Sequence, residues 1–222
     1  MNPITYLTDQ VMIPFLSFSY HSIYPNVGIG IIILTIIVKL ALYPLTKKQF
    51  ESMKKMQEMM PIFKKLKEKH KNDPKKIQME TMAIYKEHNI NPMGGCLPMV
   101  IQLPFLFALF YTMNGTSFEA FIAQDGIFPG FTTFWLTDLS QPDAFFILPV
   151  VIGIATYIGQ KLATTDPNHQ KILMMMPVIM VVISFKMPGG VLLYWAISQI
   201  ISSAQQIIIL NANPPTKSVT PS

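Results

Sequence analysis

Residues Val27–Leu45 read VGIGIIILTIIVKLALYPL, and this stretch decides the fold. It contains 19 residues, of which only Lys39 is charged. A helix needs about 20 mainly apolar residues to cross the roughly 30 Å hydrocarbon core of a bilayer. We therefore expect Val27–Leu45 to be a transmembrane helix.

Four more apolar segments follow, and together with the first they predict a membrane-embedded bundle. The last, Pro188–Leu210, has 23 residues and no charge, so it is long enough to span a bilayer alone. Leu97–Met113 reaches that length with its flanks, whereas Ala144–Gly159 and Ile172–Phe185 are shorter. The sequence thus predicts an all-α integral membrane protein with five transmembrane helices, four of them within residues 92–210.

The composition of the chain excludes several other classes of protein. Only 13% of the 222 residues are charged, about half of the roughly 25% that is usual in soluble proteins. Half of the residues are hydrophobic, which excludes disorder for most of the chain, and the single cysteine, Cys96, excludes a disulfide scaffold. All 17 basic residues are lysines. Arginine is the usual reader of guanine and phosphate, so sequence-specific binding of nucleic acid is not expected.

The distribution of charge predicts the orientation of the chain in the membrane. Thr46–Asn91 holds 12 of the 17 lysines, whereas Asn114–Asp143 holds four acidic residues and no lysine. Lysine-rich loops stay on the cytoplasmic side. We therefore expect the N-terminus outside and the C-terminus in the cytoplasm.

The two ends of the chain differ in pattern. Met1–Asn26 has no lysine and no signal-peptide pattern. It predicts an amphipathic helix on the outer membrane surface, because its apolar residues recur every three to four positions. These residues are Ile4, Leu7, Val11, Phe15 and Phe18. Asn211–Ser222 contains three prolines and is expected to be a disordered cytoplasmic tail.

The lysine-rich segment, Thr46–Asn91, predicts a cytoplasmic helical hairpin. Apolar residues recur at helical spacing on both sides of Asn72-Asp73-Pro74, where Asp73 can cap a helix and Pro74 suits its first turn. The segment is also rich in methionine. Methionine-rich surfaces adapt to varied apolar partners. The alternative, a plain apolar seam between the two helices, explains about half of the methionines in this segment. The candidate residues for recruiting a substrate are Met56, Met59, Met60, Lys64, Lys65 and Lys71.

Lys39 is the most informative residue inside a predicted span. A buried charge is costly and usually faces protein or water, although Lys39 lies near enough to the cytoplasmic end to reach the headgroups instead. Thr35 shares its helix face. Amides and hydroxyls recur in the other spans, and no span contains a carboxylate. Interhelical hydrogen bonds, at about 0.6 kcal/mol each, explain one or two of them. We infer a hydrated cavity around Lys39 that opens to the cytoplasm.

No enzyme signature is present in the sequence. It lacks the HExxH, GxSxG and Walker motifs, and its four histidines are scattered. Cys96 has no histidine nearby in sequence. We therefore expect no catalytic residue, no bound metal and no cofactor.

Four stretches resemble the YidC/Oxa family of membrane protein insertases. They are GIIILTIIVKLALYPLTKK at Gly30–Lys48, NPMGGCLPMVIQLPFLFALFYTM at Asn91–Met113, DPNHQKILMMMP at Asp166–Pro177 and PGGVLLYWAISQIISSAQQ at Pro188–Gln206. The resemblance implies five core helices and a cytoplasmic hairpin. It also implies the insertion of newly made membrane proteins into lipid, alone or beside the Sec translocon, without nucleotide.

The resemblance also implies where a substrate is held. Lys39 stands where the family carries a positively charged arginine in an intramembrane groove, and Thr35, Tyr194 and Trp195 match positions that contact substrates. The full candidate groove consists of Lys39, Thr35, Gln102, Gln160, Tyr194, Trp195, Ser198 and Gln199. The implied partners are nascent membrane proteins and membrane lipid, with the Sec translocon, the ribosome and the signal recognition particle as further candidates. The implied location is the bacterial plasma membrane.

Three other functions fit parts of the pattern. A membrane-embedded assembly chaperone without insertase activity differs little in sequence. A transporter of small anionic solutes would use Lys39 as its anion site, but the inverted repeats typical of transporters are not apparent. An intramembrane enzyme would need a catalytic pair, which the sequence does not offer.

Overall fold

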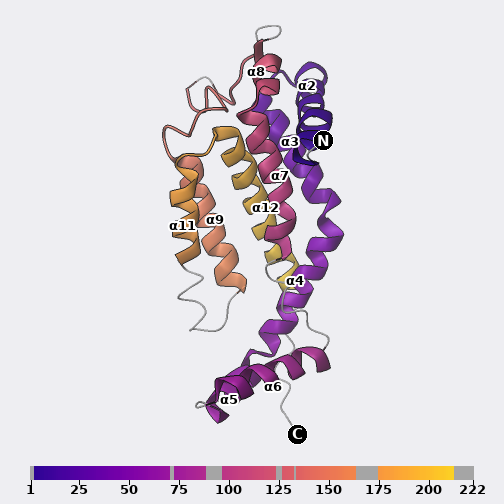
Figure 1. Ribbon diagram of the computed structural model, residues 1–222, viewed down its shortest axis with the longest axis vertical. Helices are drawn as coiled ribbons and strands as arrows, with labels where there is room; N and C mark the ends of the chain where they lie inside the picture. Colours follow the sequence, from indigo (N-terminus) through magenta and orange to yellow (C-terminus); the bar gives the residue numbers. More distant parts are fainter. Residues whose placement is uncertain are drawn as a thin grey trace.

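The computed structural model describes residues 3–70, 73–88, 97–123, 127–132, 134–163 and 175–212. Every named element in these ranges is a helix, and the only extended pairing there is an isolated bridge between Pro142 and Pro188 (Figure 1). The predicted all-α class is confirmed.

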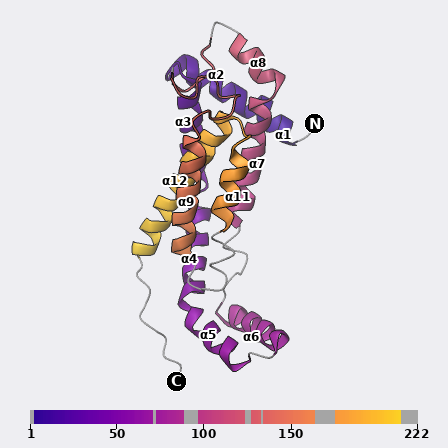
Figure 2. The ribbon, with the colours of Figure 1, turned by 90° about the vertical axis from the view of Figure 1, so that its left-hand side faces the viewer.

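Five apolar helices form an elongated bundle, as two perpendicular views show (Figures 1 and 2). They are α3 (Val27–Ala41), α7 (Leu97–Met113), α9 (Ile147–Ala163), α11 (Met175–Ser184) and α12 (Gly189–Ala212). Each overlaps a predicted span, but α3 ends at Ala41 and the next helix begins at Tyr43, inside the first predicted span. Among the described residues, α12 alone is long and apolar enough to cross a bilayer as one straight helix, and α7, α9 and α11 are shorter. The number of spans therefore stays a prediction.

Helix α12 lies at the centre of the packing. It contacts α3, α4, α7 and α9, and residues Val191, Leu192 and Leu193 at its start are buried. The close approach of α12 to α7 depends on Gly190, because a Cβ atom there would lie 2.6 Å from the Sδ atom of Met113. The central helix therefore fixes the positions of its neighbours.

The N-terminal segment is helical, as predicted. It comprises α1 (Pro3–Leu7), one π-helical turn, η1 (Thr8–Met12), and α2 (Ile13–Ser22). Residues 4–22 are bent by 118° relative to α3. The side packed against the bundle holds Met12 and Leu16, whereas Val11 and Phe18 of the predicted apolar stripe are exposed. Location on the membrane surface stays a prediction.

A folded connection joins α8 (Thr116–Ala123) to α9 and closes one end of the bundle. Asp143 is 2% exposed and accepts three hydrogen bonds, from Trp135 Nε1 at 2.8 Å and from the backbone N–H groups of Phe145 at 3.1 Å and Leu148 at 2.7 Å. The connection also holds α12, because the N–H of Gly189 donates to the carbonyl of Gln141 at 2.7 Å. Asp143 thus ties the connection to the start of α9.

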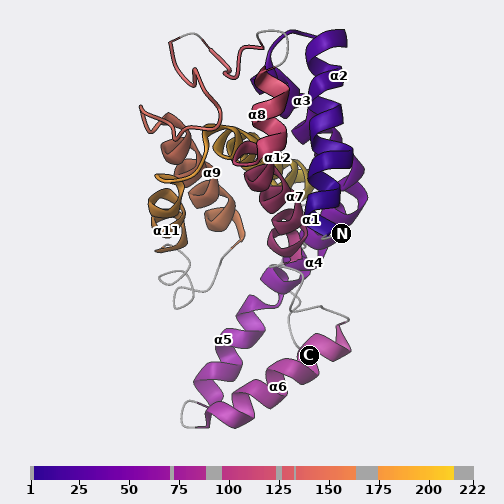
Figure 3. The same ribbon diagram turned by 45° about the horizontal axis from the view of Figure 1, so that its top comes forward.

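The predicted hairpin lies at the opposite end of the bundle (Figures 1 and 3). Helix α4 (Tyr43–Glu58) leads away from α3, and α5 (Met60–Lys69) and α6 (Pro74–Glu87) pack side by side. The first arm is broken at Met59 instead of running as one helix. Pro61 accounts for the break, because it has no N–H to donate to the preceding turn.

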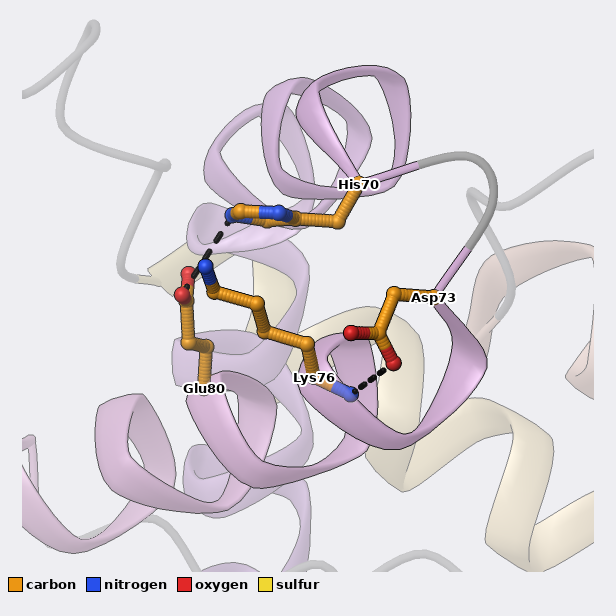
Figure 4. A network of polar contacts seen from close by, with 4 residues as sticks. All are labelled: His70, Asp73, Lys76 and Glu80. Atoms are coloured by element: carbon orange, nitrogen blue, oxygen red, sulfur yellow. Dashed lines mark hydrogen bonds and ion pairs between the residues drawn. The ribbon is translucent and has the colours of Figure 1, made fainter.

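The tip of the hairpin is built around Asp73 (Figure 4). Its carboxylate accepts a hydrogen bond from the backbone N–H of Lys76 at 3.0 Å, and Pro74 occupies the first turn of α6. The predicted cap is confirmed. On the same tip, the His70 Nε2 atom lies 3.3 Å from the Glu80 carboxylate and joins α5 to α6.

Loss of this cap is expected to loosen the start of α6. Asp73→Ala removes the acceptor for the N–H of Lys76 and should cost about 1 kcal/mol of local stability. Hydrogen exchange of the first α6 amides should accelerate about fivefold, the kinetic equivalent of that energy, while exchange in α12 stays unchanged. Asp73→Asn retains the cap and serves as the control. Equal exchange in Asp73→Ala and the wild type would refute the assignment.

Candidate functional site

Lys39 is directed across the bundle toward α12. Its Nζ atom donates a hydrogen bond to the Ser202 hydroxyl at 2.8 Å, and its side chain is half-buried. Elsewhere on the surface of α3, the nearby residues Ile37 and Leu40 are 48% and 66% exposed. The lysine therefore lies on the inward face of its helix, and no carboxylate among the described residues pairs with it.

Three other residues of the candidate groove are buried. Thr35 donates to the carbonyl of Ile31 in its own helix at 2.7 Å, and Ser198 is 1% exposed. Tyr194 is also 1% exposed, and its hydroxyl accepts a hydrogen bond from Gln102 Nε2. The structure thus brings Gln102 and Tyr194 together as a link between α7 and α12.

A ladder of hydrogen bonds joins α9 to α12 and accounts for much of the polar pattern. Gln199 Nε2 donates to the Thr156 hydroxyl at 2.9 Å. Further along, Ser203 donates to the carbonyl of Ala155 and Gln206 donates to that of Gly159, both at 3.2 Å. Polar residues commonly hold apolar helices together in this way. Gln199, which is predicted to line the groove, therefore also holds α12 against α9.

The remaining two candidates of the groove are half-buried. Trp195 packs against the main hydrophobic core of the bundle. Gln160, on α9, has a buried Oε1 atom with no hydrogen-bond partner. The candidate groove residues thus lie on α3, α7, α9 and α12. The direct contact to Lys39 comes from Ser202, which is not in the candidate set.

The hairpin separates the predicted recruiting residues into two groups. Met59 is buried against Phe63, with Met56 and Met60 packed beside them, so these three methionines form a seam. Lys64 and Lys65 are exposed, and Lys71 lies outside the described residues. Among the described hairpin residues, the exposed methionines are Met79 and Met82 on α6, at 71% and 45%. Their position away from the stripe of Ile77 and Ile84 is the sequence signal that could have identified them.

The polar groups inside the bundle can donate and accept hydrogen bonds and supply one positive charge. Among the described residues, no cluster of three or more His, Cys, Asp or Glu side chains could hold a metal ion. Binding of a polar or acidic chain segment is the chemistry that such an arrangement supports.

An all-α membrane protein with polar groups and one cation between apolar helices is the class that these features define. A family model described as 60Kd inner membrane protein matches residues 18–216. The chain belongs to this inner membrane protein family, and the family resemblance found in the sequence is confirmed.

Two of the most similar curated relatives share one name. The "Membrane protein insertase YidC" of Fusobacterium nucleatum subsp. nucleatum is 43% identical over 187 residues, which cover 83% of this chain and 86% of that protein. The protein of the same name from Pseudoalteromonas atlantica is 43% identical over 204 residues, 90% of this chain but 36% of the relative. The chain therefore matches most of one relative and about a third of the other.

A solved structure shares the fold. The crystal structure of an active YidC insertase, with its first transmembrane domain resolved, is 28% identical and superposes with a TM-score of 0.71. The match covers 87% of this chain and 44% of the solved chain.

Proposed function

We propose that this chain inserts newly made membrane proteins into the lipid bilayer by accepting their polar segments beside Lys39, between α3 and α12. The main support is the bond from Lys39 Nζ to the Ser202 hydroxyl, 2.8 Å long, which directs a cation between α3 and α12. Family membership supports the insertase activity. The relatives named membrane protein insertase supply the substrate class.

The chemistry of this contact favours acidic segments. A lysine makes shorter and stronger hydrogen bonds to a carboxylate than to a neutral hydroxyl. Two opposite charges 4 Å apart attract by about 4 kcal/mol at an effective dielectric constant of 20. An acidic residue of a substrate can therefore displace Ser202 from Lys39 for as long as the segment passes.

The apolar part of the substrate leaves into lipid beside α3 and α12. The short helices α9 and α11 carry exposed apolar side chains, such as Ile154 and Val182, that suit contact with lipid tails. Helices shorter than the hydrocarbon thickness thin the local bilayer. A thinner bilayer shortens the distance over which a hydrophilic segment must be moved.

The hairpin is the first contact of an incoming substrate. The exposed side chains of Met79 and Met82 suit apolar segments, and Lys64 and Lys65 suit acidic ones. In this scheme the hairpin and the C-terminus face the cytoplasm of a bacterial cell, and the N-terminus faces outward. Cooperation with the Sec translocon, the ribosome or the signal recognition particle belongs to the same proposal.

Reconstitution tests the function. The purified chain in liposomes should insert a single-span client with a short acidic outer segment, measured as protease protection of that segment, without any Sec component. Empty liposomes are the control. Client that is bound but never protected would indicate an assembly chaperone, and release of a trapped anionic dye would indicate a transporter. Either result without insertion would overturn the proposal.

A further inference from the structure

Three exposed phenylalanines form a cluster at the end of the bundle opposite the hairpin (Figure 1). Phe145 and Phe146 precede α9, and Phe185 follows α11. The rings of Phe146 and Phe185 are in edge-to-face contact, with their centroids 5.1 Å apart and their planes at 75°. The bridge between Pro142 and Pro188 holds the two segments together. The fold thus gathers aromatic side chains from distant parts of the chain on one surface.

The backbone at this cluster is strained. Phe146 has a φ of 56°, in the left-handed region that bulky residues rarely adopt. Asp143 holds it there, because its carbonyl accepts the N–H of Phe146 at 3.2 Å and its carboxylate accepts the N–H groups on either side. Glycine or asparagine would adopt this conformation at lower cost. A turn that only connected two elements would not need a phenylalanine here, so the exposed ring points to a partner outside the chain.

Lys186 adds a positive charge beside the cluster. It follows Phe185 directly, and its side chain is exposed. It is an exception in the charge pattern, since residues 1–38 and 87–160 contain no lysine. No carboxylate in the described part of the chain forms an ion pair with Lys186, and the carboxylate of Asp143 is buried and bonded to three N–H groups. The ammonium group of Lys186 is therefore free to bind an external anion.

The cluster borders an exposed apolar face of the bundle. The face is formed by α9 and α11, which pack against each other, and includes Val150, Ile154, Val178 and Val182. In a member of an inner membrane protein family, such a face contacts acyl chains. Phenylalanine rings enter the boundary between acyl chains and headgroups, and a lysine at the same border extends its ammonium group to the headgroups. A lipid would thus meet the apolar face with its tails and Lys186 with its headgroup.

We propose that Lys186 and the Phe146–Phe185 pair bind a phospholipid, with the lysine on its phosphate and the rings against the upper part of its acyl chains. An ammonium group makes strong, charge-assisted hydrogen bonds to phosphate. Charge complementarity and continuity with the apolar face favour a phospholipid over a protein partner. The site goes beyond the proposed function, because it requires only that the bundle lies in a bilayer, and its test does not involve insertion of a client.

A bound phospholipid would hold α11 at a fixed depth in the bilayer. Among the described helices, α9 is the one against which α11 packs extensively, so lipid is the other main neighbour of α11. A headgroup bound at Lys186 fixes the end of α11 relative to the bilayer surface. The site therefore limits how far α9 and α11 can move along the bilayer normal.

Photocrosslinking identifies what occupies the site. The photoreactive analogue p-benzoylphenylalanine replaces Phe145, the most exposed ring of the cluster, in the full chain reconstituted into vesicles. The vesicles contain equal amounts of phosphatidylglycerol and of a neutral glycolipid with the same acyl chains. Mass spectrometry should detect phosphatidylglycerol adducts in about fivefold excess, as expected for one lysine beside anionic headgroups. The same analogue at Tyr111, an exposed aromatic position of α7, should give no excess.

Two matched lysine variants test the charge. Lys186→Gln should abolish the excess at position 145. Lys161→Gln, which removes another exposed lysine at the other end of α9, should leave the excess unchanged. An excess that persists in Lys186→Gln, equal labelling of both lipids in the wild type, or adducts with protein instead of lipid would each overturn the site.

Phe146→Asn tests the ring. Asparagine accepts the positive φ more readily than phenylalanine does, so the turn and the melting temperature should be retained. The yield of phosphatidylglycerol adducts at position 145 should nevertheless fall, because the acyl chains lose their contact with the ring. An unchanged yield, or a yield that falls only together with the melting temperature, would overturn the assignment of Phe146 to the lipid site.

Discussion

Replacing Lys39 with alanine is expected to slow the insertion of a client with an acidic outer segment about tenfold, equivalent to ~1.4 kcal/mol of lost stabilisation. The physical reason is the loss of the one cation that the described part of the bundle directs inward, toward Ser202. Initial rates of protease protection in liposomes measure the effect. A neutral client should be slowed much less.

Two further variants at the same position separate charge from shape. Lys39→Arg keeps the charge and should retain most of the activity. Lys39→Met keeps most of the length of the side chain without the charge, and should be as slow as Lys39→Ala. Moving the ammonium group of Lys39 out of water costs free energy in the folded state, and Lys39→Met removes that cost. The substitution should therefore not lower the melting temperature. A Lys39→Ala protein that inserts the acidic client at the wild-type rate would contradict the charge mechanism.

Asp143→Ala is expected to be the most destabilising substitution considered for this chain, at about 3 kcal/mol. The buried carboxylate accepts three hydrogen bonds, and its removal leaves the indole of Trp135 and two backbone N–H groups without their acceptor. For a chain of this size, the melting temperature in detergent should fall by roughly 6–12 °C. Local unfolding of the Asp143→Ala protein should begin where the connection meets α9 and α12.

Two matched variants define what the carboxylate does. Asp143→Asn retains one acceptor oxygen and the shape of the side chain, so its loss should be smaller. Asp138→Ala removes a half-buried carboxylate whose bonds within the described residues come from Ser140 alone, and should cost less still. If Asp143→Ala melts within ~2 °C of the wild type, which corresponds to less than about 1 kcal/mol, the carboxylate does not organise this connection.

The helices and their caps could be predicted from the sequence because they depend on local pattern. The apolar stretches locate the helices of the bundle, and Asp73-Pro74 locates the start of α6. The sequence left two directions open for Lys39, toward the bundle or toward the headgroups, and only its contact with Ser202 on α12 shows that it points inward. The break at Met59 was missed, although Pro61 signals it.

The partners of polar side chains could not be predicted, because they depend on which helices become neighbours. On α12, Ser202 is bonded to Lys39 on α3, whereas Gln199, three residues earlier, is bonded to Thr156 on α9. Gln49 is buried although it lies in the hydrophilic first arm of the hairpin, where the sequence gives no reason to expect burial. Asp143 was recognised as part of an acidic loop, and its three donors come from backbone and side-chain positions that only the folded connection brings together.

The central claim, that water reaches the Lys39 position inside the bilayer, is tested most directly by cysteine labelling. Lys39→Cys and Leu40→Cys, each with Cys96→Ser, are compared in sealed vesicles with a water-soluble maleimide on the hairpin side. Maleimides react with a thiolate, which requires water. We expect rapid labelling at position 39 and little at position 40, whose wild-type leucine is 66% exposed on the outer surface of the bundle. Equally slow labelling at both positions would contradict this claim.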